Sequence, residues 1–341
     1  MNEHLINQLQ KIISNKEKAS ENEIIHLVNQ LLTKHSSIKD PTSISDLSQE
    51  VVNQITDKSF QYPILKTGLK NLDEITNFNL GDLVVIGARP SMGKTQLIVN
   101  LCSHLSTDFP VLYFSFDLSE RLISSRFLAL ASGIGFDKIA QHQLTDTEIE
   151  TLKETINTLK QHKIFINDMG AQSISAIKAQ CKKYIEEHNI KVLVIDYLQM
   201  MSSRNHKYNR ELEMSYMVRE LKNMARDFNI CVIAASQLSR AVEVRGGAKK
   251  PNLSDLRDSG AIEQDADKVF FLYRPEYYGL TVDEDGNDTL GKVELILTKN
   301  RNGKTGTAHL KIDENFIKYQ DDNNEKEHFN FAQKRLGDFF K

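Results

Sequence analysis

The segment Asp82 to Thr95, DLVVIGARPSMGKT, constrains the fold of this chain more than any other. An apolar run with strand character breaks into a loop of small residues that ends in Gly93-Lys94-Thr95, and a helical pattern, QLIVNLCSHL, follows at once. A parallel strand that delivers a loop to the start of a helix directs free backbone N–H groups and the positive end of the helix dipole at anionic oxygens. The segment therefore predicts a phosphate-binding loop in an α/β fold.

The residue types in this loop indicate a nucleoside triphosphate. Lys94 would reach the β and γ phosphates of ATP, and the Thr95 hydroxyl would hold Mg²⁺. The alternative is an ordinary loop-to-helix turn. Ala88 stands where the strict G-x-x-x-x-G-K-T spacing has glycine, so we expect a narrower pocket that is still open. The expected ATP-binding residues are Ala88, Arg89, Pro90, Ser91, Met92, Gly93, Lys94 and Thr95.

Composition limits the remaining possibilities. The 341 residues, 40% of them hydrophobic, suffice for one large α/β domain and a small appendage. Cys102, Cys181 and Cys231 lie apart without C-x-x-C spacing, and the histidines show no zinc pattern, so we expect neither disulfides nor zinc. No run approaches the ~20 apolar residues of a membrane span, which predicts a cytoplasmic protein. The net charge of -3 requires any nucleic-acid contact to come from local basic patches.

Apolar runs and helical patterns alternate over most of the chain. The runs DLVVIGA, VLYFSF, KIFIND, VLVIDYLQ and NICVIAASQ are separated by helical segments, which predicts a mostly parallel sheet covered on both faces. The closing runs DKVFFLYRP, KVELILTKN and TAHLKID leave no room for long helices between them, and they predict antiparallel hairpins at one edge. Before the sheet, apolar spacing predicts a helical hairpin over residues 1–40 and a further helix from Ser45 to Thr56.

Polar side chains at strand ends form a second chemical signal. Asp196 closes an apolar strand, and it would lie beside the phosphate loop and hold Mg²⁺ through water if the two strands are neighbours. The alternative is a strand-end aspartate that caps a turn. Asp117 and Gln237 close two other strands, and they would frame the γ phosphate as water-positioning group and sensor.

Six separated motifs resemble the motor domain of DnaB-type replicative DNA helicases. They are ARPSMGKT, FSFDLSE, VLVIDYLQM, IAASQLSR, LSDLRDSGAIEQDAD and KNRNGKTGT, in the order and spacing of that family, and TGLKNLDEI before the phosphate loop fits as well. The resemblance covers approximately Pro63 to Asp313. It implies a RecA-like ATPase assembled as a ring of six, with ATP between subunits and single-stranded DNA in the central channel. It also implies travel from the five-prime toward the three-prime end.

The resemblance assigns roles to single residues. It gives Lys94 the β and γ phosphates, Thr95 and Asp196 the metal, and Gln237 the sensing of the γ phosphate. Lys299 and Arg301 resemble the pair that reaches the ATP of the neighbouring subunit, with Arg301 as the arginine finger. Taken alone, these two residues would be read as solvated charges.

Asp117 stands where the family usually has glutamate as the catalytic base. The carboxylate is one methylene shorter, and a misplacement of about 1 Å can cost about a hundredfold in rate. Three outcomes are open: the strand lies closer, Glu120 takes the role, or hydrolysis is slow. Our hypothesis is that Asp117 is the base.

Two loops are expected to contact DNA. In LSDLRDSGAIEQ the resemblance points to Arg257 and to the backbone near Asp258 and Gly260, where glycine allows close approach to phosphates. The basic residues of RAVEVRGGAKKPN would line the channel, although a short basic loop is often merely solvated. They are Arg245, Lys249 and Lys250.

The two ends of the chain suggest partners. We expect residues 1–40 to be a reduced collar, residues 41–62 to hold a linker helix that docks on the adjacent motor, residues 63–320 to be the motor, and residues 321–341 to be a tail. Family members recruit primase and a helicase loader through the collar, and a reduced collar leaves this recruitment open. The tail carries the Q-x-x-L-x-x-F-F spacing of peptides that bind PCNA-type sliding clamps; the alternative is a tail that folds back on the motor. The spacing residues are Gln333, Leu336, Phe339 and Phe340.

Two rival functions belong to other classes. One is a RecA-like ATPase that is not an unwinding motor, either a recombination mediator of the RadA or KaiC kind or a DNA-binding regulator that uses ATP only to assemble. The other is a protein that binds nucleotide without hydrolysing it, because Asp117 has disabled the reaction. The DLRDSGAIEQDAD block and the KNR stretch favour the helicase.

Overall fold

The computed structural model describes residues 42–57, 63–170, 173–201, 210–245, 247–256, 260–282, 286 and 288–323. The chain divides into two units, Met1–Tyr62 and Pro63–Lys341. The helical hairpin predicted over residues 1–40 lies outside the described residues.

In the first unit the described residues form one helix, α3 (Ile44–Thr56). It begins before the predicted start at Ser45, because Ser43 is the N-cap and its hydroxyl accepts a hydrogen bond from the Asp46 N–H at 3.1 Å. Its apolar residues Leu47, Val51, Val52 and Ile55 are each at least 40% exposed. The helix therefore presents an apolar stripe.

The second unit is organised by a sheet of nine strands, in the order β11-β10-β9-β8-β3-β7-β6-β4-β5. The strands from β8 to β5 in this order are parallel to one another, and β9, β10 and β11 continue the sheet as antiparallel neighbours. The predicted parallel sheet with hairpins at one edge is confirmed. The bounds are β3 (Leu83–Ala88), β4 (Val111–Ser115), β5 (Ile164–Asn167), β6 (Val192–Asp196), β7 (Cys231–Gln237), β8 (Lys268–Tyr273), β9 (Lys292–Asn300), β10 (Gly306–Ile312) and β11 (Tyr319–Asp321).

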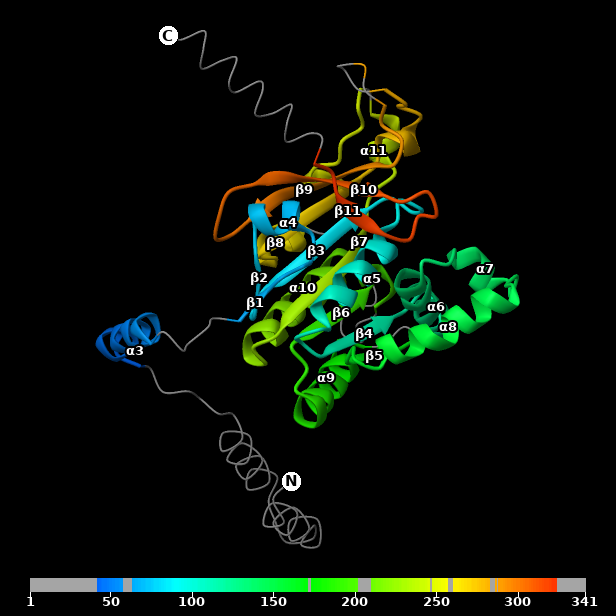
Figure 1. Cartoon of the computed structure of the whole chain (residues 1–341). Helices are drawn as coiled ribbons and strands as arrows, with labels where there is room; N and C mark the ends of the chain where they lie inside the picture. The colour runs from blue at the N-terminus through cyan, green and yellow to red at the C-terminus, as the bar shows by residue number, and fades with distance from the viewer. Residues whose placement is uncertain are drawn as a thin grey trace, which may run out of the picture. The chain divides into compact units, whose positions relative to one another are not determined.

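Helices cover both faces of this sheet (Figure 1). A two-stranded pair, β1 (Ile64–Leu65) with β2 (Phe78–Asn79), lies before it in the sequence. The helices are α4 (Lys70–Ile75), α5 (Lys94–Leu105), α6 (Glu120–Ser132), α7 (Phe136–Ala140), α8 (Asp146–Leu159), α9 (Ile174–His188), α10 (Arg210–Asp227), α11 (Ala241–Val244) and α12 (Gly260–Asp265), with 3-10 turns η1 (Leu198–Met200), η2 (Leu253–Asp255) and η3 (Pro275–Tyr278).

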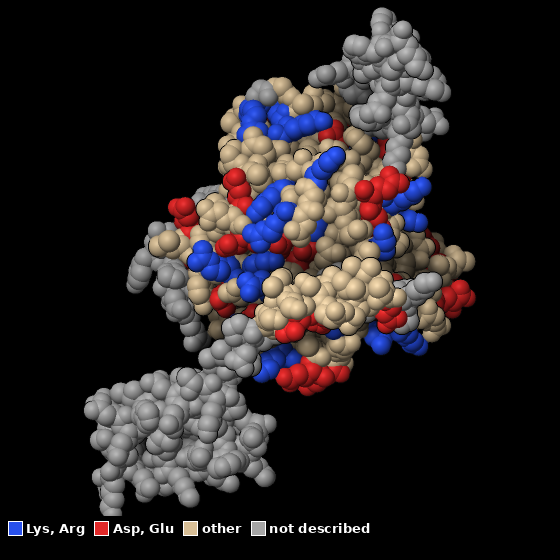
Figure 2. Space-filling model, turned by 90° about the vertical axis from the view of Figure 1, so that its left-hand side faces the viewer, with Lys and Arg blue, Asp and Glu red and all other residues tan. Residues whose placement is uncertain are grey.

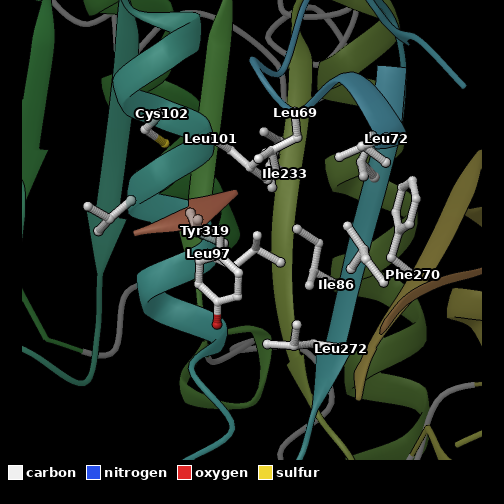
Figure 3. Packing of buried hydrophobic residues seen from close by; sticks show 14 of the residues in the cluster. Leu69, Leu72, Ile86, Leu97, Leu101, Cys102, Ile233, Phe270, Leu272 and Tyr319 are labelled. Carbon is white, nitrogen blue, oxygen red and sulfur yellow. The ribbon is translucent and has the colours of Figure 1, made fainter. Parts of the chain in front are cut away.

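The core explains why β3 is a continuous apolar run. Val84 and Ile86 face a cluster with α4, α5 and α6, whereas Leu83 and Val85 face a second cluster with α9, α10 and α12. A parallel strand buried on both faces has no solvent side on which a polar residue would be favourable. Figure 3 shows the first cluster, in which the leucines of α5 pack against Ile86 and its neighbours on the adjacent strands.

The second unit has the layers of a RecA-like ATPase domain, a mostly parallel sheet between two helical layers. This placement brings the carboxyl ends of β3, β7, β6 and β4 to one edge, where the sequence predicted the chemistry. Among the described residues, no helix is both long and apolar enough to cross a membrane.

Candidate active site

The predicted phosphate loop connects the end of β3 at Ala88 to the start of α5 at Lys94. Ser91 and Gly93 both have left-handed backbone conformations, with φ of 64° and 92°. These turns leave the first backbone N–H groups of α5 at the carboxyl edge of the sheet, where they can bind an anion. Arg89 and Met92 turn their side chains away from such an anion, because Arg89 pairs with Glu243 at 2.7 Å and Met92 is buried in the core. The loop therefore offers mainly backbone.

Tyr319 supports this loop through a contact with Gly93. The sequence patterns did not predict this role. The Tyr319 hydroxyl donates to the Gly93 carbonyl at 3.1 Å, and a Cβ atom on Gly93 would lie 2.4 Å from that hydroxyl oxygen. Figure 3 shows the ring beside the first turn of α5. Burial raises the pKa of Tyr319, so the phenol remains a hydrogen-bond donor. No motif predicts such a residue, because the contact depends on where β11 folds back.

Two polar side chains of α5 fasten the same segment. Gln96 and Asn100 donate to the Ile317 carbonyl at 2.7 and 2.9 Å, and the Tyr319 N–H donates to the Asn100 side chain at 3.0 Å. Both side chains are buried. Buried amides with satisfied hydrogen bonds fix one geometry, because any displacement would leave them unpaired. The segment before β11 therefore holds α5, and with it the loop, in place.

Lys94 lies among acidic and aromatic groups. Its ammonium nitrogen is 4.7 Å from the centre of the Tyr197 ring. Burial lowers the pKa of Lys94, and the charges of Asp196 and Asp117 oppose this effect. The fold thus brings together three residues that the sequence predicted for one site, Lys94, Asp117 and Asp196.

Asp196 ends β6, but β6 is not a neighbour of β3. The condition on which the sequence placed Asp196 beside the loop is therefore not met, because β7 lies between the two strands. The aspartate still lies close enough to Lys94 to affect its pKa. It is 3% exposed, and the Tyr113 hydroxyl donates to its Oδ2 at 2.8 Å. Burial, together with the charge of Asp196, raises the pKa of Tyr113, so this hydroxyl stays protonated and orients the carboxylate.

Asp117 and Glu120 differ in where their charges act. Asp117 follows β4, which pairs directly with β6, and its charge affects the pKa of Lys94 and of Tyr197. Glu120 begins α6, and its backbone N–H donates to the Asp168 carboxylate at 2.9 Å. Asp117 thus lies near Lys94, and its role as the base stays a prediction.

Gln237 ends β7 directly opposite Ala88 in the sheet register, so it stands where the phosphate loop begins. Gln199 holds it there: its side chain accepts from the Gln237 N–H at 3.1 Å and donates to the Ser236 hydroxyl at 3.0 Å. Sequence reasoning quoted Gln199 within VLVIDYLQ but gave it no role. The end of β6 and the end of β7 are therefore coupled through one amide side chain.

Lys299 and Arg301 lie beside the amino-terminal ends of the parallel strands, at the end of the sheet away from the phosphate loop. Asn300 pairs with Lys268 and Lys268 with Val84, four residues before Ala88 on β3. At about 3.3 Å per residue, the level of Asn300 in the sheet lies roughly 13 Å along the strands from Ala88, where the phosphate loop begins. The loop extends farther in the same direction. Figure 2 views the side on which the β9–β10 turn projects in Figure 1, and Lys and Arg side chains gather on it in a band. The predicted finger is therefore remote from the phosphate loop of its own chain.

The basic loop after α11 is paired within the chain. Arg245 contacts the buried Asp255 at 2.6 Å, and Lys250 contacts Glu294 at 2.6 Å. The ammonium group of Lys249 lies 5.5 Å from the centre of the Tyr278 ring. Gly260 is the first residue of α12, whereas Arg257 and Asp258 lie outside the described residues. So do the tail residues Gln333, Leu336, Phe339 and Phe340.

Comparison with known families agrees with this geometry. Residues 65–321 match the model of the DnaB-like helicase C terminal domain. The chain is 40% identical over 308 residues to a "Probable replicative DNA helicase" of Trieres chinensis, covering 87% of this chain and 67% of the relative. It is 36% identical to the replicative DNA helicase DnaB of Rickettsia prowazekii (strain Madrid E), covering 91% of this chain and 68% of that protein. The chain thus spans about two thirds of these curated relatives.

Solved structures show the same fold. One that is described as an ATPase domain superposes with a TM-score of 0.76 at 31% identity, covering 83% of this chain and 100% of that domain. A structure described as a DnaB-like replicative helicase and its interactions with primase gives a TM-score of 0.77 at 30% identity, covering 92% of this chain and 74% of that one. Both structures are therefore similar to this chain in fold and in sequence.

Proposed function

The chain belongs to the family of DnaB-like replicative DNA helicases, and from this premise we propose that it hydrolyses ATP to move along single-stranded DNA and separate the strands of duplex DNA during replication. The observation that carries the proposal is the separation of two half-sites. The phosphate loop lies at the carboxyl edge of the parallel strands, and Lys299 and Arg301 lie at the opposite edge. Such a chain completes a hydrolytic site only with a second copy.

The first half-site would hold ATP and Mg²⁺. The residues fit these ligands, because the loop offers backbone N–H groups, Lys94 offers a cation, and Thr95 and Asp196 offer the oxygen ligands that Mg²⁺ prefers. Bound Mg²⁺ would neutralise charge on the β and γ phosphates. Asp117 would position and deprotonate the attacking water, and Gln237 would respond to the γ phosphate from the adjacent strand end. Tyr113 would keep the Asp196 carboxylate in a single orientation.

The second half-site would act on the neighbouring subunit. The surface around Arg301 of one copy would contact the surface around the phosphate loop of the next copy. Such a contact is head-to-tail, and head-to-tail contacts close into a ring when the rotation between neighbouring copies permits it. A ring of six is typical of the family. The exposed apolar stripe of α3 supports the proposed role of residues 41–62 as a linker that docks on an adjacent motor, since such a stripe is stabilised by burial.

DNA would be held by phosphate contacts. Arg257 and the backbone near Asp258 and Gly260 are proposed for one loop, and Arg245, Lys249 and Lys250 for the other. Because Arg245 and Lys250 already pair with carboxylates, we propose that Lys249 makes the larger contribution. Phosphate contacts carry no base information, so binding should tolerate any sequence and weaken steeply with salt. A single-strand affinity and salt slope that are unchanged in Lys249→Ala and in Arg257→Ala would contradict these assignments.

Partners are proposed from the remaining segments. Primase and a helicase loader are candidates for residues 1–40, and the likeness to a helicase described with primase supports the first. A PCNA-type sliding clamp is proposed for the part of the tail that holds Gln333, Leu336, Phe339 and Phe340, whereas Asp321, where the tail was predicted to begin, still belongs to β11. The test compares the retention of the full chain and of a chain without its last residues on an immobilised clamp. Equal retention of the two would contradict the proposed clamp binding.

The function is tested by strand separation on a forked duplex with ATP and Mg²⁺. We expect the duplex to be separated when the single-stranded arm has a free five-prime end, and not when the fork has only a three-prime arm. A recombination mediator would bind both substrates and separate neither. Hydrolysis that does not depend on a fork, without any separated product, would therefore favour the mediator.

The role of Asp117 gives a separate prediction. Asp117→Asn keeps the size of the side chain but cannot accept a proton, and general-base catalysis contributes about a hundredfold or more, so ATP turnover should fall by at least about a hundredfold. Asp117→Glu should retain turnover, and Glu120→Gln, the matched control, should remain near wild type. Steady-state phosphate release checks all three. Unchanged release in Asp117→Asn would remove Asp117 from the mechanism, and a loss in Glu120→Gln would transfer the role.

A further inference from the structure

The turn between β9 and β10 is fastened to the carboxyl end of α12. The Arg301 guanidinium donates to Asp267 Oδ1 at 3.2 Å and to the Gln264 carbonyl at 3.1 Å, and the Arg301 backbone N–H donates to the Asp267 carbonyl at 2.8 Å. Lys299 donates to the Gln264 carbonyl at 3.0 Å and to the Glu263 carbonyl. The two residues proposed to act on the neighbour's ATP therefore share one support.

Asp267 is the rigid member of that support. It is 3% exposed, and its second oxygen, Oδ2, accepts from the Leu83 N–H at 2.8 Å and from the Lys222 ammonium at 2.6 Å. Leu83 is the first residue of β3, so the carboxylate is anchored to the central strand. A buried carboxylate that is bound on one side by a strand and a lysine has no freedom to turn. The contact on its other oxygen then fixes where the guanidinium lies.

The geometry points to Asp267 as the positioning residue for the arginine finger, aided by the carboxyl-terminal carbonyls of α12. This inference rests on the proposed function, because it assigns Arg301 to the neighbour's ATP. Asp267 touches neither nucleotide nor water in this scheme; it acts only through Arg301. Guanidinium has five N–H donors in a planar fork, and the side-chain bonds described above use two of them. The side chain is 46% exposed, so it is accessible to a ligand on a neighbouring subunit.

The local charge balance supports this direction. Lys222 and Arg301 pair with Asp267, and the charge of Asp267 also acts on Lys299, while Asp265 is engaged by Arg219 at 3.6 Å. Burial lowers the pKa of Lys299, and the charge of Arg301 lowers it further. An approaching anion would offset the repulsion that Arg301 exerts on the Lys299 ammonium. A triphosphate on the adjacent subunit supplies that anion.

The first test is Asp267→Asn, measured as kcat and KM for ATP in the full chain with single-stranded DNA. Asparagine can still accept from the Leu83 N–H, but it has no charge for Arg301. We expect kcat to fall by about tenfold or more while KM stays within about twofold, because the nucleotide pocket is untouched. Asp322→Asn is the matched control, since Asp322 is another buried carboxylate that pairs with a lysine, Lys311, at 3.1 Å. It should keep the wild-type kcat. A kcat that is unchanged or raised in Asp267→Asn would overturn the inference.

Chemical rescue gives a second test that leaves Asp267 intact. Arg301→Ala removes the guanidinium but leaves the Asp267 and Gln264 oxygens that held it. Added guanidinium ion at low millimolar concentration should then restore turnover in a saturable way, and urea, which has a similar shape without the charge, should not. Rescue should vanish when Asp267→Asn is added to Arg301→Ala. Absence of any guanidinium rescue with Asp267 present, or equal rescue without it, would contradict the positioning role.

The two failures can be told apart. If Arg301→Ala alone keeps full turnover, the proposed finger is wrong and the function has to be revised. If Arg301→Ala abolishes turnover but Asp267→Asn does not affect kcat, only the positioning role fails.

Discussion

Lys94→Ala is expected to lower ATP turnover by at least about a thousandfold, because it removes the side-chain cation of the loop that faces the transferred phosphate. The substitution also removes the positive charge that lies near Asp196 and Asp117, so we expect the site to repel a triphosphate. Binding of a fluorescent ATP analogue should therefore weaken as well. Both quantities are measured on the same preparation, by phosphate release and by fluorescence titration.

Two variants make this prediction specific. Lys153→Ala removes a lysine that is exposed on α8 and paired with Glu150, and it should behave like wild type. Lys94→Arg retains the charge but replaces a compact ammonium by a broad planar group, so we expect it to bind nucleotide and to hydrolyse it poorly. Full turnover in Lys94→Ala would show that the loop does not hold the phosphates.

Arg301→Ala is expected to lower turnover by about a thousandfold or more while leaving ATP affinity near that of wild type. Arginine fingers contribute about 10³ to 10⁵ in rate, and they do so by stabilising charge in the transition state rather than by holding the substrate. Because Arg301 lies at the edge opposite its own phosphate loop, the loss should appear at a boundary between subunits. A large rise in KM instead would indicate a role in binding.

Mixing the two inactive variants tests the boundary directly. A Lys94→Ala subunit keeps its finger, and an Arg301→Ala subunit keeps its phosphate loop. A boundary site is complete where an Arg301→Ala subunit supplies the phosphate loop and a Lys94→Ala subunit supplies the finger. Random mixing in equal amounts forms this arrangement at about a quarter of the boundaries, so it should restore up to about a quarter of wild-type turnover if boundaries act independently. No recovery at any mixing ratio, together with full turnover by wild-type monomers, would mean that each chain hydrolyses ATP by itself.

The sequence predicted the sheet because its signals are local. The apolar run before Ala88 and the glycine in a left-handed conformation at residue 93 are dictated by burial on both faces and by a turn that few residues tolerate. The same locality let the ends of β4, β6 and β7 be recognised as one reactive edge. The order of the strands is not local, so the adjacency of β6 and β3 could be stated only as a condition, and the structure does not meet it.

The supporting residues of the site could not be predicted for a similar reason. Tyr113, Gln199 and Tyr319 make their contacts across large gaps in the sequence, and each looks like an ordinary core or loop residue in its own segment. The ion pairs of Arg245 and Lys250 were equally hidden, since a run of basic residues does not indicate which carboxylates fold against it. Motifs specify the groups that touch ligands, and tertiary packing specifies the groups that hold them.

The bond between Tyr319 and Gly93 joins residues 226 positions apart. A ribosome makes Gly93 long before it makes Tyr319, so a growing chain carries the loop without its rear brace until the second unit is nearly finished. Domains tend to fold as units during synthesis. We therefore expect that nascent chains that lack Tyr319 do not bind ATP, and that only completed chains enter an assembly.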